Sequence, residues 1–350
     1  MRIVVIGATG NIGACLVEAL AADDDVDEVI GVARRRPTSW HPPRTRWVTA
    51  DIATDDLRPV LEGADAVCNL AWAIQPSHDQ TRAHRVNVVG SERVFRTAAE
   101  AGVGVLLHAS SVGAYAAGPR DRRVGEDHPT HGIPTSFYSW QKAYAERLLD
   151  IVERDHPQLR VVRIRPAIVG RYGSAAHVRR LFAGPLLPGS LMGRLPFTPT
   201  PAGLRLQVVH AADVAEGFRL ALRSGERGAF NLAAEPVLEP AMIADAVGGR
   251  AVPVPTPLAR AAVDASWRLR LQPTPAGWVD MAMQAPLLDT GRARSMLGWA
   301  PRHGARETLE EVLRGLRDGA GDDTPPLSPT VGGRARLREF TTGIGGNGRG

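Results

Sequence analysis

Short apolar runs alternate with helical patterns through the first half of the 350-residue chain. Strands that are bounded by turns and separated by helices are typical of a parallel sheet covered on both faces. The sequence therefore predicts an α/β fold built on a doubly wound parallel sheet, the Rossmann arrangement. Strands are expected at 3–6, 29–33, 47–50, 66–70, 103–109 and 160–164, and helices at 12–22, 79–101 and 136–154.

The chain changes character after Pro166, where Pro and Gly become frequent. We expect a Rossmann domain at 1–165 and a smaller C-terminal substrate lobe at 166–318, with segments that return to the Rossmann core. From 319 to 350 the chain is rich in Gly and Pro and poor in periodic apolar residues, which predicts a disordered tail. Strands at 206–209 and 229–232 and helices at 290–297 and 305–317 are expected in the lobe.

Composition narrows the class of protein. The formal net charge is +5, but the arginines are scattered and no nucleic-acid-binding module is visible, so nucleic acid is not an expected partner. Cys15 and Cys68 show no metal-ligand spacing and are expected to be buried thiols in a reducing compartment, so no metal is expected. No apolar stretch is long enough for a membrane span or a signal peptide, which predicts a cytoplasmic protein with no membrane partner.

Three glycines in "VVIGATGNIG" join the first expected strand to the first expected helix. Their spacing allows a tight turn, brings the backbone close to a pyrophosphate and directs a helix N-terminus at negative charge. Because the loop opens an alternating strand and helix series, it predicts a dinucleotide site, the alternative being a purely structural turn. The residues expected at the dinucleotide are Gly7, Thr9, Gly10, Asn11, Ile12 and Gly13.

The end of the second expected strand bears on the choice of cofactor. An acid that binds the adenosine ribose of NAD is expected there, but Ala33 holds the position and Arg34 and Arg35 follow it. A guanidinium pairs well with a 2′-phosphate, so NADP is predicted and NAD stays possible. The alternative is that both arginines are solvated surface residues. Asp51 and Ile52, after the next strand, are expected to border the adenine.

The stretch "YSWQKAYAE" contains Lys142, which is the only lysine among the 42 Lys and Arg residues of the chain. Tyr138 precedes it by four residues, so on a helix both side chains lie on one face. A tyrosine hydroxyl titrates near pH ~10, and a neighbouring ammonium lowers that pKa toward neutrality. The pair therefore predicts a proton-transferring Tyr138 assisted by Lys142, the alternative being an incidental lysine on an exposed helix.

Two hydroxyls, of Ser110 and Ser111, follow the strand expected at 103–109. The carboxyl end of a central parallel strand points into the crevice where a nicotinamide would lie. Ser111 is expected to hold the oxygen of the substrate, and Ser110 is the less favoured candidate. Alternatively, both serines satisfy backbone groups at the end of the strand.

Taken together, these motifs resemble the extended short-chain dehydrogenase/reductase family, also called the NAD-dependent epimerase/dehydratase family. The resemblance covers 1–317 and names a family rather than a substrate. It includes "GATGNIG", "ADI", "RVNVVGS", "SSVGAY", "YSWQK", "RPAIVG", "VVHAADVAEG", "FNLA" and "ARSMLGWAPR".

The resemblance implies roles for individual residues. Tyr138 would be the general acid/base, Lys142 its modulator and ribose anchor, and Ser111 the hydroxyl that polarises the substrate oxygen. Asn87 would support the architecture of the site, and the family's pairing helices, here 79–101 and 136–154, imply a possible homodimer. Further residues expected beside the cofactor are Ala71, Asn87, Pro166 and Val169.

The expected activity is hydride transfer between NAD(P) and a carbonyl or carbinol carbon of a small molecule. An apolar, proline-rich lobe favours a simple oxidoreductase slightly over a sugar-nucleotide epimerase, and dehydration is least favoured because "SSVGAY" carries no acid. A dinucleotide-binding sensor or scaffold without chemistry is the alternative of another class. It is disfavoured because Tyr138 and Lys142 are both present.

Other polar residues also have interpretations of their own. Trp72, Gln75 and His78 follow the fourth strand and are either substrate contacts or part of an ordinary loop. Asp213 is expected to cap a helix. His108 lies inside a strand and is expected to be a satisfied core residue.

Overall fold

The protein is described by a computed structural model over residues 1–75, 77–184 and 196–330. Its main sheet has seven strands in the order β11-β7-β5-β4-β1-β2-β3, and every neighbouring pair is parallel. The predicted doubly wound parallel sheet is therefore confirmed. The strands are β1 (Arg2–Ile6), β2 (Glu28–Ala33), β3 (Thr45–Thr49), β4 (Ala66–Asn69), β5 (Val105–Ala109), β7 (Arg160–Pro166) and β11 (Gly228–Leu232).

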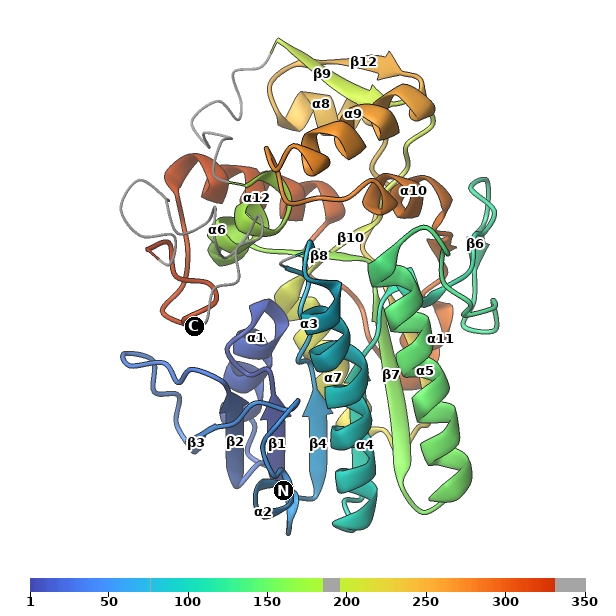
Figure 1. Ribbon diagram of the computed structural model, residues 1–350. Coiled ribbons are helices and arrows are strands. Elements are labelled where there is room, and N and C mark those ends of the chain that lie inside the picture. Colours follow the sequence, from blue (N-terminus) through green and yellow to red (C-terminus); the bar gives the residue numbers. More distant parts are fainter. Residues whose placement is uncertain (76, 185–195, 331–350) are drawn as a thin grey trace.

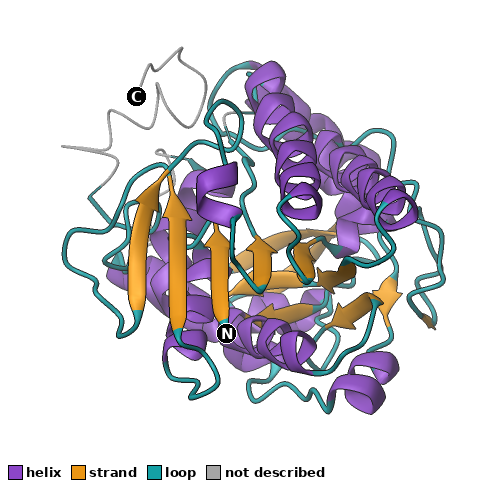
Figure 2. Ribbon diagram, turned by 90° about the horizontal axis from the view of Figure 1, so that it is seen from below, coloured by secondary structure: helices purple, strands orange, loops and turns teal. Residues whose placement is uncertain are grey.

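Helices lie on both sides of this sheet (Figures 1 and 2). The segment expected as one helix over 79–101 is helical through most of its length, but a π-helical turn, Arg85–Gly90, separates its two α-helical parts. The helices that flank the sheet are α1 (Asn11–Ala21), α2 (Arg58–Leu61), α3 (Gln80–His84), α4 (Ser91–Glu100), α5 (Phe137–Asp155), α7 (Ala211–Arg223) and α11 (Gly291–Leu297).

The central strand β1 shows why both faces of the sheet are covered. Successive side chains of a strand point to opposite faces. Ile3 and Val5 belong to a buried cluster with side chains of α1 and α7, whereas Val4 and Ile6 belong to another with side chains of α4 and α5. The continuous apolar run of this strand follows directly from burial on both sides.

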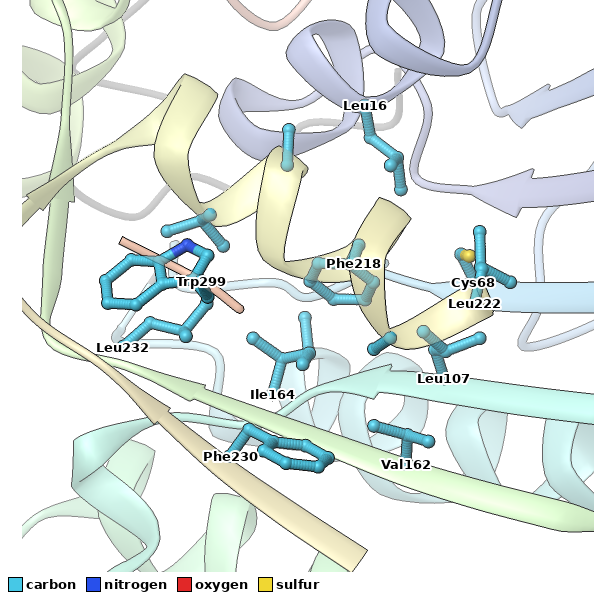
Figure 3. Packing of buried hydrophobic residues seen from close by; sticks show 14 of the residues in the cluster. Leu16, Cys68, Leu107, Val162, Ile164, Phe218, Leu222, Phe230, Leu232 and Trp299 are labelled. Carbon is cyan, nitrogen blue, oxygen red and sulfur yellow. The ribbon is translucent and has the colours of Figure 1, made fainter. Parts of the chain in front are cut away.

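Figure 3 shows the first of these clusters. Phe218 and Leu222 of α7 pack over Leu107 of β5 and over Val162 and Ile164 of β7. All five side chains are buried, so α7 covers this face of the sheet. It does so although it belongs to the part of the chain after Pro166, where the smaller lobe was expected.

The remaining elements gather mainly at the carboxyl edge of the main sheet (Figure 1). The strand expected at 229–232 is an exception, because it joins the main sheet as β11 beside β7. Residues 185–195 of the expected lobe lie outside the described residues. The small sheets pair β8 (Ile168–Gly170) with β10 (Val208–His210), β9 (Phe197–Pro201) with β12 (Arg250–Val254), and β6 (Arg123–Val124) with β13 (Leu287–Leu288). The helices are α6 (Ala175–Val178), α8 (Pro240–Ala246), α9 (Thr256–Arg268), α10 (Gly277–Gln284) and α12 (Ala305–Asp318), with short helical turns at Val112–Ala114, Tyr172–Ser174 and Arg179–Ala183.

The segment Gly319–Thr330, here called the C-terminal segment, differs from the expected disordered tail. Leu327 is fully buried, and the hydroxyl of Thr324 donates to the carbonyl of Thr9 at 2.8 Å. A single buried leucine and a hydrogen bond to a distant loop leave no periodic pattern in the sequence, which is why composition did not reveal this structure. Residues 331–350 of the expected tail lie outside the described residues.

Within the described ranges, none of the helices has both the length and the apolar character needed to cross a bilayer.

The packing of α7 on the sheet leads to a stability prediction. Phe218 is 0% exposed, so Phe218→Ala should lower the free energy of unfolding by about 3–5 kcal/mol through lost burial and a cavity. Leu258 on α9 is 61% exposed, and Leu258→Ala should cost less than about 0.5 kcal/mol. Chemical denaturation of both variants checks this, and similar losses would contradict the assignment of α7 to the core.

Candidate active site

The glycine loop connects β1 to α1 in a conformation that excludes side chains at two positions. Gly7 has a φ of +81°, and a Cβ there would lie 2.7 Å from the backbone nitrogen of Ala71. A Cβ on Gly13 would lie 2.3 Å from the carbonyl oxygen of Gly7. The loop therefore packs directly against the end of β4, which places Ala71 beside it.

The start of α1 suits a bound anion. Gly10 precedes the helix, and among the described residues no side chain caps its first turn and no acid lies within it. A Cβ on Gly10 would meet only the Gly7 carbonyl, at 3.2 Å, so the backbone is open on that side. Unpaired N–H groups and the helix dipole both favour a phosphate group at this point. These residues fit the pyrophosphate of a dinucleotide.

Three other loop residues have structural contacts of their own. Thr9 is buried and uses its carbonyl to accept from the C-terminal segment. Asn11 donates from its amide to the carbonyl of Val169 at 3.3 Å, which ties the start of α1 to β8. Ile12 packs against the core cluster under α1.

The adenine end of the predicted site is assembled from β2 and the loop after β3. Arg34 and Arg35 are exposed directly after Ala33, the last residue of β2. Asp51 accepts from the backbone N–H of Ala53 at 2.9 Å. Ile52 is 4% exposed, and a Cβ on Gly90 would lie 2.7 Å from its side chain, so this residue is a packed wall.

Tyr138, Ser111 and Lys142 lie together where α5 passes the carboxyl end of β5. Burial raises the pKa of Tyr138 to about 12, and the hydrogen bond with Ser111 opposes that rise. The Ser111 oxygen also accepts from the backbone N–H of Gly113 at 3.0 Å. The phenol is therefore protonated at neutral pH and lies beside the Ser111 hydroxyl, which is held by the backbone.

The ammonium group of Lys142 points elsewhere than the spacing suggests. Its Nζ donates to the carbonyl of Ala109 at 2.7 Å and lies 3.4 Å from the ring centroid of Trp72. The distance from Nζ to the ring centroid of Tyr138 is 5.9 Å. Burial lowers the pKa of Lys142 well below its usual value, and Glu146 opposes that shift. The expected lowering of the Tyr138 pKa by Lys142 is absent, because desolvation outweighs an ammonium directed at a carbonyl and an indole.

Aromatic and apolar side chains enclose the ring of Tyr138. The ring of Trp278, on α10, lies 4.8 Å from it between centroids, and Trp72 meets it edge-on at 6.1 Å. A Cβ on Gly113 would lie 2.9 Å from the Tyr138 ring and 3.1 Å from the sulfur of Met281. No sequence pattern pointed to Trp278, because it comes from a helix far along the chain.

A buried carboxylate, Glu146, lies one helical turn beyond Lys142. It accepts from the hydroxyl of Ser110 at 2.6 Å and from Nε and Nη2 of Arg165, each at 2.9 Å. Arg163 lies 3.1 Å from the same carboxylate. Ser110 is thereby committed to Glu146, whereas Ser111 remains beside Tyr138. The i, i+4 spacing from Lys142 is a signal that could have identified Glu146 from sequence.

Comparison with models of known protein families shows which family the chain belongs to. The family model described as "NAD dependent epimerase/dehydratase family" matches residues 3–233. The chain belongs to this family.

Similar proteins and structures extend the comparison. An uncharacterised protein of Mycobacterium tuberculosis is 28% identical over 324 residues, which cover 92% of this chain and 31% of that protein, so the chain spans about a third of this relative. The human sterol-4-alpha-carboxylate 3-dehydrogenase, decarboxylating, is 30% identical over 147 residues, 42% of this chain and 38% of that enzyme. The solved UDP-glucose 4-epimerase of Thermus thermophilus, in complex with NAD, has a TM-score of 0.66 at 21% identity and covers 91% of this chain and 99% of that chain, which shows a shared fold.

In this member of the NAD-dependent epimerase/dehydratase family, Asn87 connects the loop after β4 to α5. Its Oδ1 accepts from the N–H of Ala73 at 2.6 Å, and its Nδ2 donates to the Ala73 carbonyl and to Gln141 of α5, each at 2.8 Å. The side chain thus holds the loop with Ala71 and Trp72 against the helix of Tyr138. Pro166 ends β7 and is buried.

Two of the loop residues considered as substrate contacts, Gln75 and His78, already contact other parts of the protein. Gln75 donates to the carbonyls of Leu181 at 2.7 Å and Pro273 at 3.0 Å. His78 stacks on Trp267 with 4.2 Å between ring centroids. Both connect the loop after β4 to the elements above the sheet.

Three polar residues, His108, His210 and Asp213, lie outside the site. His108 is 1% exposed, and burial, together with the charge of Lys142, lowers its pKa well below the usual value. The cap of α7 is His210, which accepts from the N–H of Ala212 at 3.2 Å. Asp213 does not cap that helix as expected, because its carboxylate accepts from the N–H groups of Arg302 and His303, each at 3.0 Å.

The protein also has a cavity of about 490 Å³ away from Tyr138 and Lys142. Glu146, Arg163 and Arg165 are among its lining residues, so it borders the buried ion pairs rather than the predicted catalytic groups. Across the described ranges, no group of three or more His, Cys, Asp and Glu side chains is arranged to hold a metal ion.

The Glu146 network leads to a second stability prediction. Glu146→Gln leaves Arg163 and Arg165 without their shared charge and should cost about 3–5 kcal/mol of unfolding free energy. The matched control is Glu92→Gln on α4, whose carboxylate pairs with Arg96, 65% exposed, and which should cost less than about 0.5 kcal/mol. Urea denaturation at pH 7 measures both, and equal losses would contradict a dominant role for Glu146.

The lowered pKa of Glu146 also predicts a pH dependence of stability. Burial alone would raise the pKa of Glu146, but Arg165, Arg163 and Ser110 lower it to about 2. Since the unfolded carboxyl titrates near ~4.3, its stabilisation is present above about pH 5 and is lost as the pH falls toward 2. The stability difference between wild type and Glu146→Gln should therefore shrink over that interval in denaturation curves. A constant difference would show that the carboxylate has no lowered pKa.

Proposed function

We propose that the chain is an NAD(P)-dependent oxidoreductase that transfers a hydride between the nicotinamide and a carbonyl or carbinol carbon of a small molecule. The observation that supports this most directly is the placement of Tyr138 beside Ser111 at the carboxyl edge of the sheet, on the same helix as Lys142. The glycine loop belongs to the same edge, and membership of an NAD-dependent family adds to the argument.

The residues proposed to hold the dinucleotide follow from their placement. The glycine loop and the first turn of α1 would bind the pyrophosphate, Ile52 and Asp51 would border the adenine, and Val169 would lie at the nicotinamide end. When bound, the cofactor supplies or accepts the hydride. Lys142 is the proposed ribose anchor, which requires its ammonium to leave the face of Trp72.

Tyr138 is proposed as the group that exchanges a proton with the substrate oxygen. Its phenol is protonated at neutral pH because burial raises its pKa to about 12. A protonated phenol can donate to the oxygen of a carbonyl as that oxygen gains negative charge, while Ser111 donates a hydrogen bond to the same oxygen. Alcohol oxidation by the same groups would first require the phenolate of Tyr138.

The aromatic surroundings favour a simple oxidoreductase over a sugar-nucleotide epimerase. Trp72 and Trp278 contact the Tyr138 ring, and Phe182 meets Trp278 edge-on with 4.9 Å between centroids. Apolar walls recognise an apolar substrate better than a hydroxylated sugar. Epimerisation remains the second candidate because the fold is shared with a UDP-glucose 4-epimerase, and it would produce no net NAD(P)H. A sensor without chemistry would bind the dinucleotide but turn over nothing.

A cytoplasmic homodimer is the proposed assembly. Two apolar side chains of α5, Tyr144 and Ile151, are 47% and 43% exposed and lie seven residues apart on one side of the helix. Such an unpaired stripe suits helix-to-helix contact between two copies, consistent with the pairing that the family resemblance implies.

The proton-transfer role leads to a kinetic prediction. Tyr138→Phe should lower kcat at least about a hundred-fold on a ketone found by screening with NADPH, because the proton donor is removed. Fluorescence titration should give an unchanged Kd for NADPH. The control is Tyr144→Phe, which alters an exposed tyrosine of the same helix and should leave kcat within about two-fold. Undiminished turnover in Tyr138→Phe would remove the proposed mechanism.

The cofactor preference leads to a binding prediction. We propose that NADP is preferred because Arg34 and Arg35 can pair with the 2′-phosphate, and Arg34→Ala should then weaken NADPH binding about ten-fold while changing NADH binding less than about two-fold. Arg36→Ala, at the next exposed position, is the control and should affect neither cofactor. Equal losses for NADPH and NADH, or wild-type preference for NADH, would contradict this proposal.

A further inference from the structure

The C-terminal segment, Gly319–Thr330, lies against the glycine loop. Figure 1 shows the chain after α12, in red, descending beside α6 toward the upper end of α1. Thr324 is 2% exposed and donates to the Thr9 carbonyl at 2.8 Å. Backbone bonds anchor the start of the segment, from Ala320 N–H to the Gly315 carbonyl at 2.8 Å and from Ala176 N–H to the Ala320 carbonyl at 3.0 Å. The segment is thus part of the surroundings of the proposed pyrophosphate site.

Arg171 connects this segment to the start of α1. Its Nε donates to Oδ1 of Asn11 at 3.2 Å, and its Nη2 pairs with a carboxylate oxygen of Asp322. The side chain of Arg171 is 16% exposed and that of Asp322 is 38% exposed. A mostly buried guanidinium therefore contacts the side chain of Asn11, the first residue of α1. This is the helix at whose start the pyrophosphate is proposed to bind.

We propose that Arg171 is a pyrophosphate-binding residue and that Asp322 competes with the dinucleotide for its guanidinium. This inference rests on the dinucleotide binding proposed above. In the absence of the dinucleotide Arg171 pairs with Asp322, and in its presence the guanidinium pairs with the pyrophosphate and the C-terminal segment loosens from the glycine loop.

Charge explains why the two anions compete. A pyrophosphate in a dinucleotide carries two negative charges and needs a cation beside it in a partly desolvated site, but the Arg171 guanidinium is paired with Asp322. Arginine binds phosphate and carboxylate oxygens with the same planar donors, so both are suitable partners for one guanidinium. The C-terminal segment carries two acids, Asp322 and Asp323, and no Lys or Arg, so it brings no compensating charge of its own.

Four variants test the competition, each measured as the Kd of NADPH and of ADP-ribose by calorimetry. Arg171→Gln should weaken both about ten-fold, because both ligands contain the pyrophosphate. Asp322→Asn should tighten both about three- to ten-fold, because the competing charge is removed. The matched control is Asp323→Asn, which removes the same charge from the exposed neighbouring residue and should change Kd less than about two-fold. The double variant Arg171→Gln/Asp322→Asn should bind like Arg171→Gln alone, because Asp322 acts through Arg171.

Hydrogen exchange provides a readout that does not depend on affinity. The N–H of Asp322 donates to the Leu327 carbonyl at 3.1 Å, and the N–H of Leu327 donates to the Thr324 carbonyl at 3.0 Å. Saturating ADP-ribose should accelerate exchange of these amides in the wild type. In Asp322→Asn, ADP-ribose should change their exchange rates to a smaller extent. Thermal denaturation of each variant establishes that it is folded.

The outcomes separate this inference from the proposed function. If the wild type binds neither NADPH nor NADH, both fail. If the wild type binds NADPH but Arg171→Gln binds it equally well, only the role of Arg171 fails. If Asp322→Asn weakens binding and ADP-ribose protects the Asp322 and Leu327 amides, the segment is a clamp on the bound dinucleotide, and competition is overturned. Tightening in Asp323→Asn equal to that in Asp322→Asn would reduce the effect to general charge and would also overturn the proposal.

Discussion

The buried carboxylate of Glu146 is the interaction on which the arrangement of the candidate site depends. It projects from α5, the helix of Tyr138 and Lys142, and accepts from Ser110 after β5 and from Arg165 on β7. A carboxylate with so little exposure is stable only if its hydrogen bonds and opposite charges are all present. The helix, the serine loop and the strand are therefore held in one register by an electrostatic requirement rather than by apolar packing alone.

The same network extends to the far edge of the sheet. Arg165 also donates to the hydroxyl of Tyr115 at 2.9 Å, and that hydroxyl donates to Asn231 on β11 at 2.7 Å. β11 comes from the second part of the chain, yet it joins the sheet through β7 and this polar contact. The elements that cover the carboxyl edge of the sheet are in this way connected to the helix that bears the proposed proton donor.

Features that depend on local pattern could be predicted from the sequence. A glycine at position 13 signals the close approach to the Gly7 carbonyl, where a side chain would not fit. The helix face shared by Tyr138 and Lys142 follows from their four-residue spacing. Pairings between distant segments could not be predicted in this way. Arg171 bonds a residue 160 positions away, and Thr324 bonds one 315 positions away, so neither contact leaves a periodic trace.

Desolvation has opposite consequences for charge at the two ends of the proposed site. At the nicotinamide end, burial disfavours charge on Tyr138 and Lys142, so Tyr138 is a neutral donor whose phenolate, formed when it gives up its proton, must be reprotonated before the next turnover. At the pyrophosphate end, the charge of the ligand is permanent and must be matched by the start of α1 and by Arg171. An apolar carbonyl or carbinol compound suits the first environment and a dinucleotide suits the second, so the division of polarity within the site supports the proposed hydride transfer with an uncharged substrate.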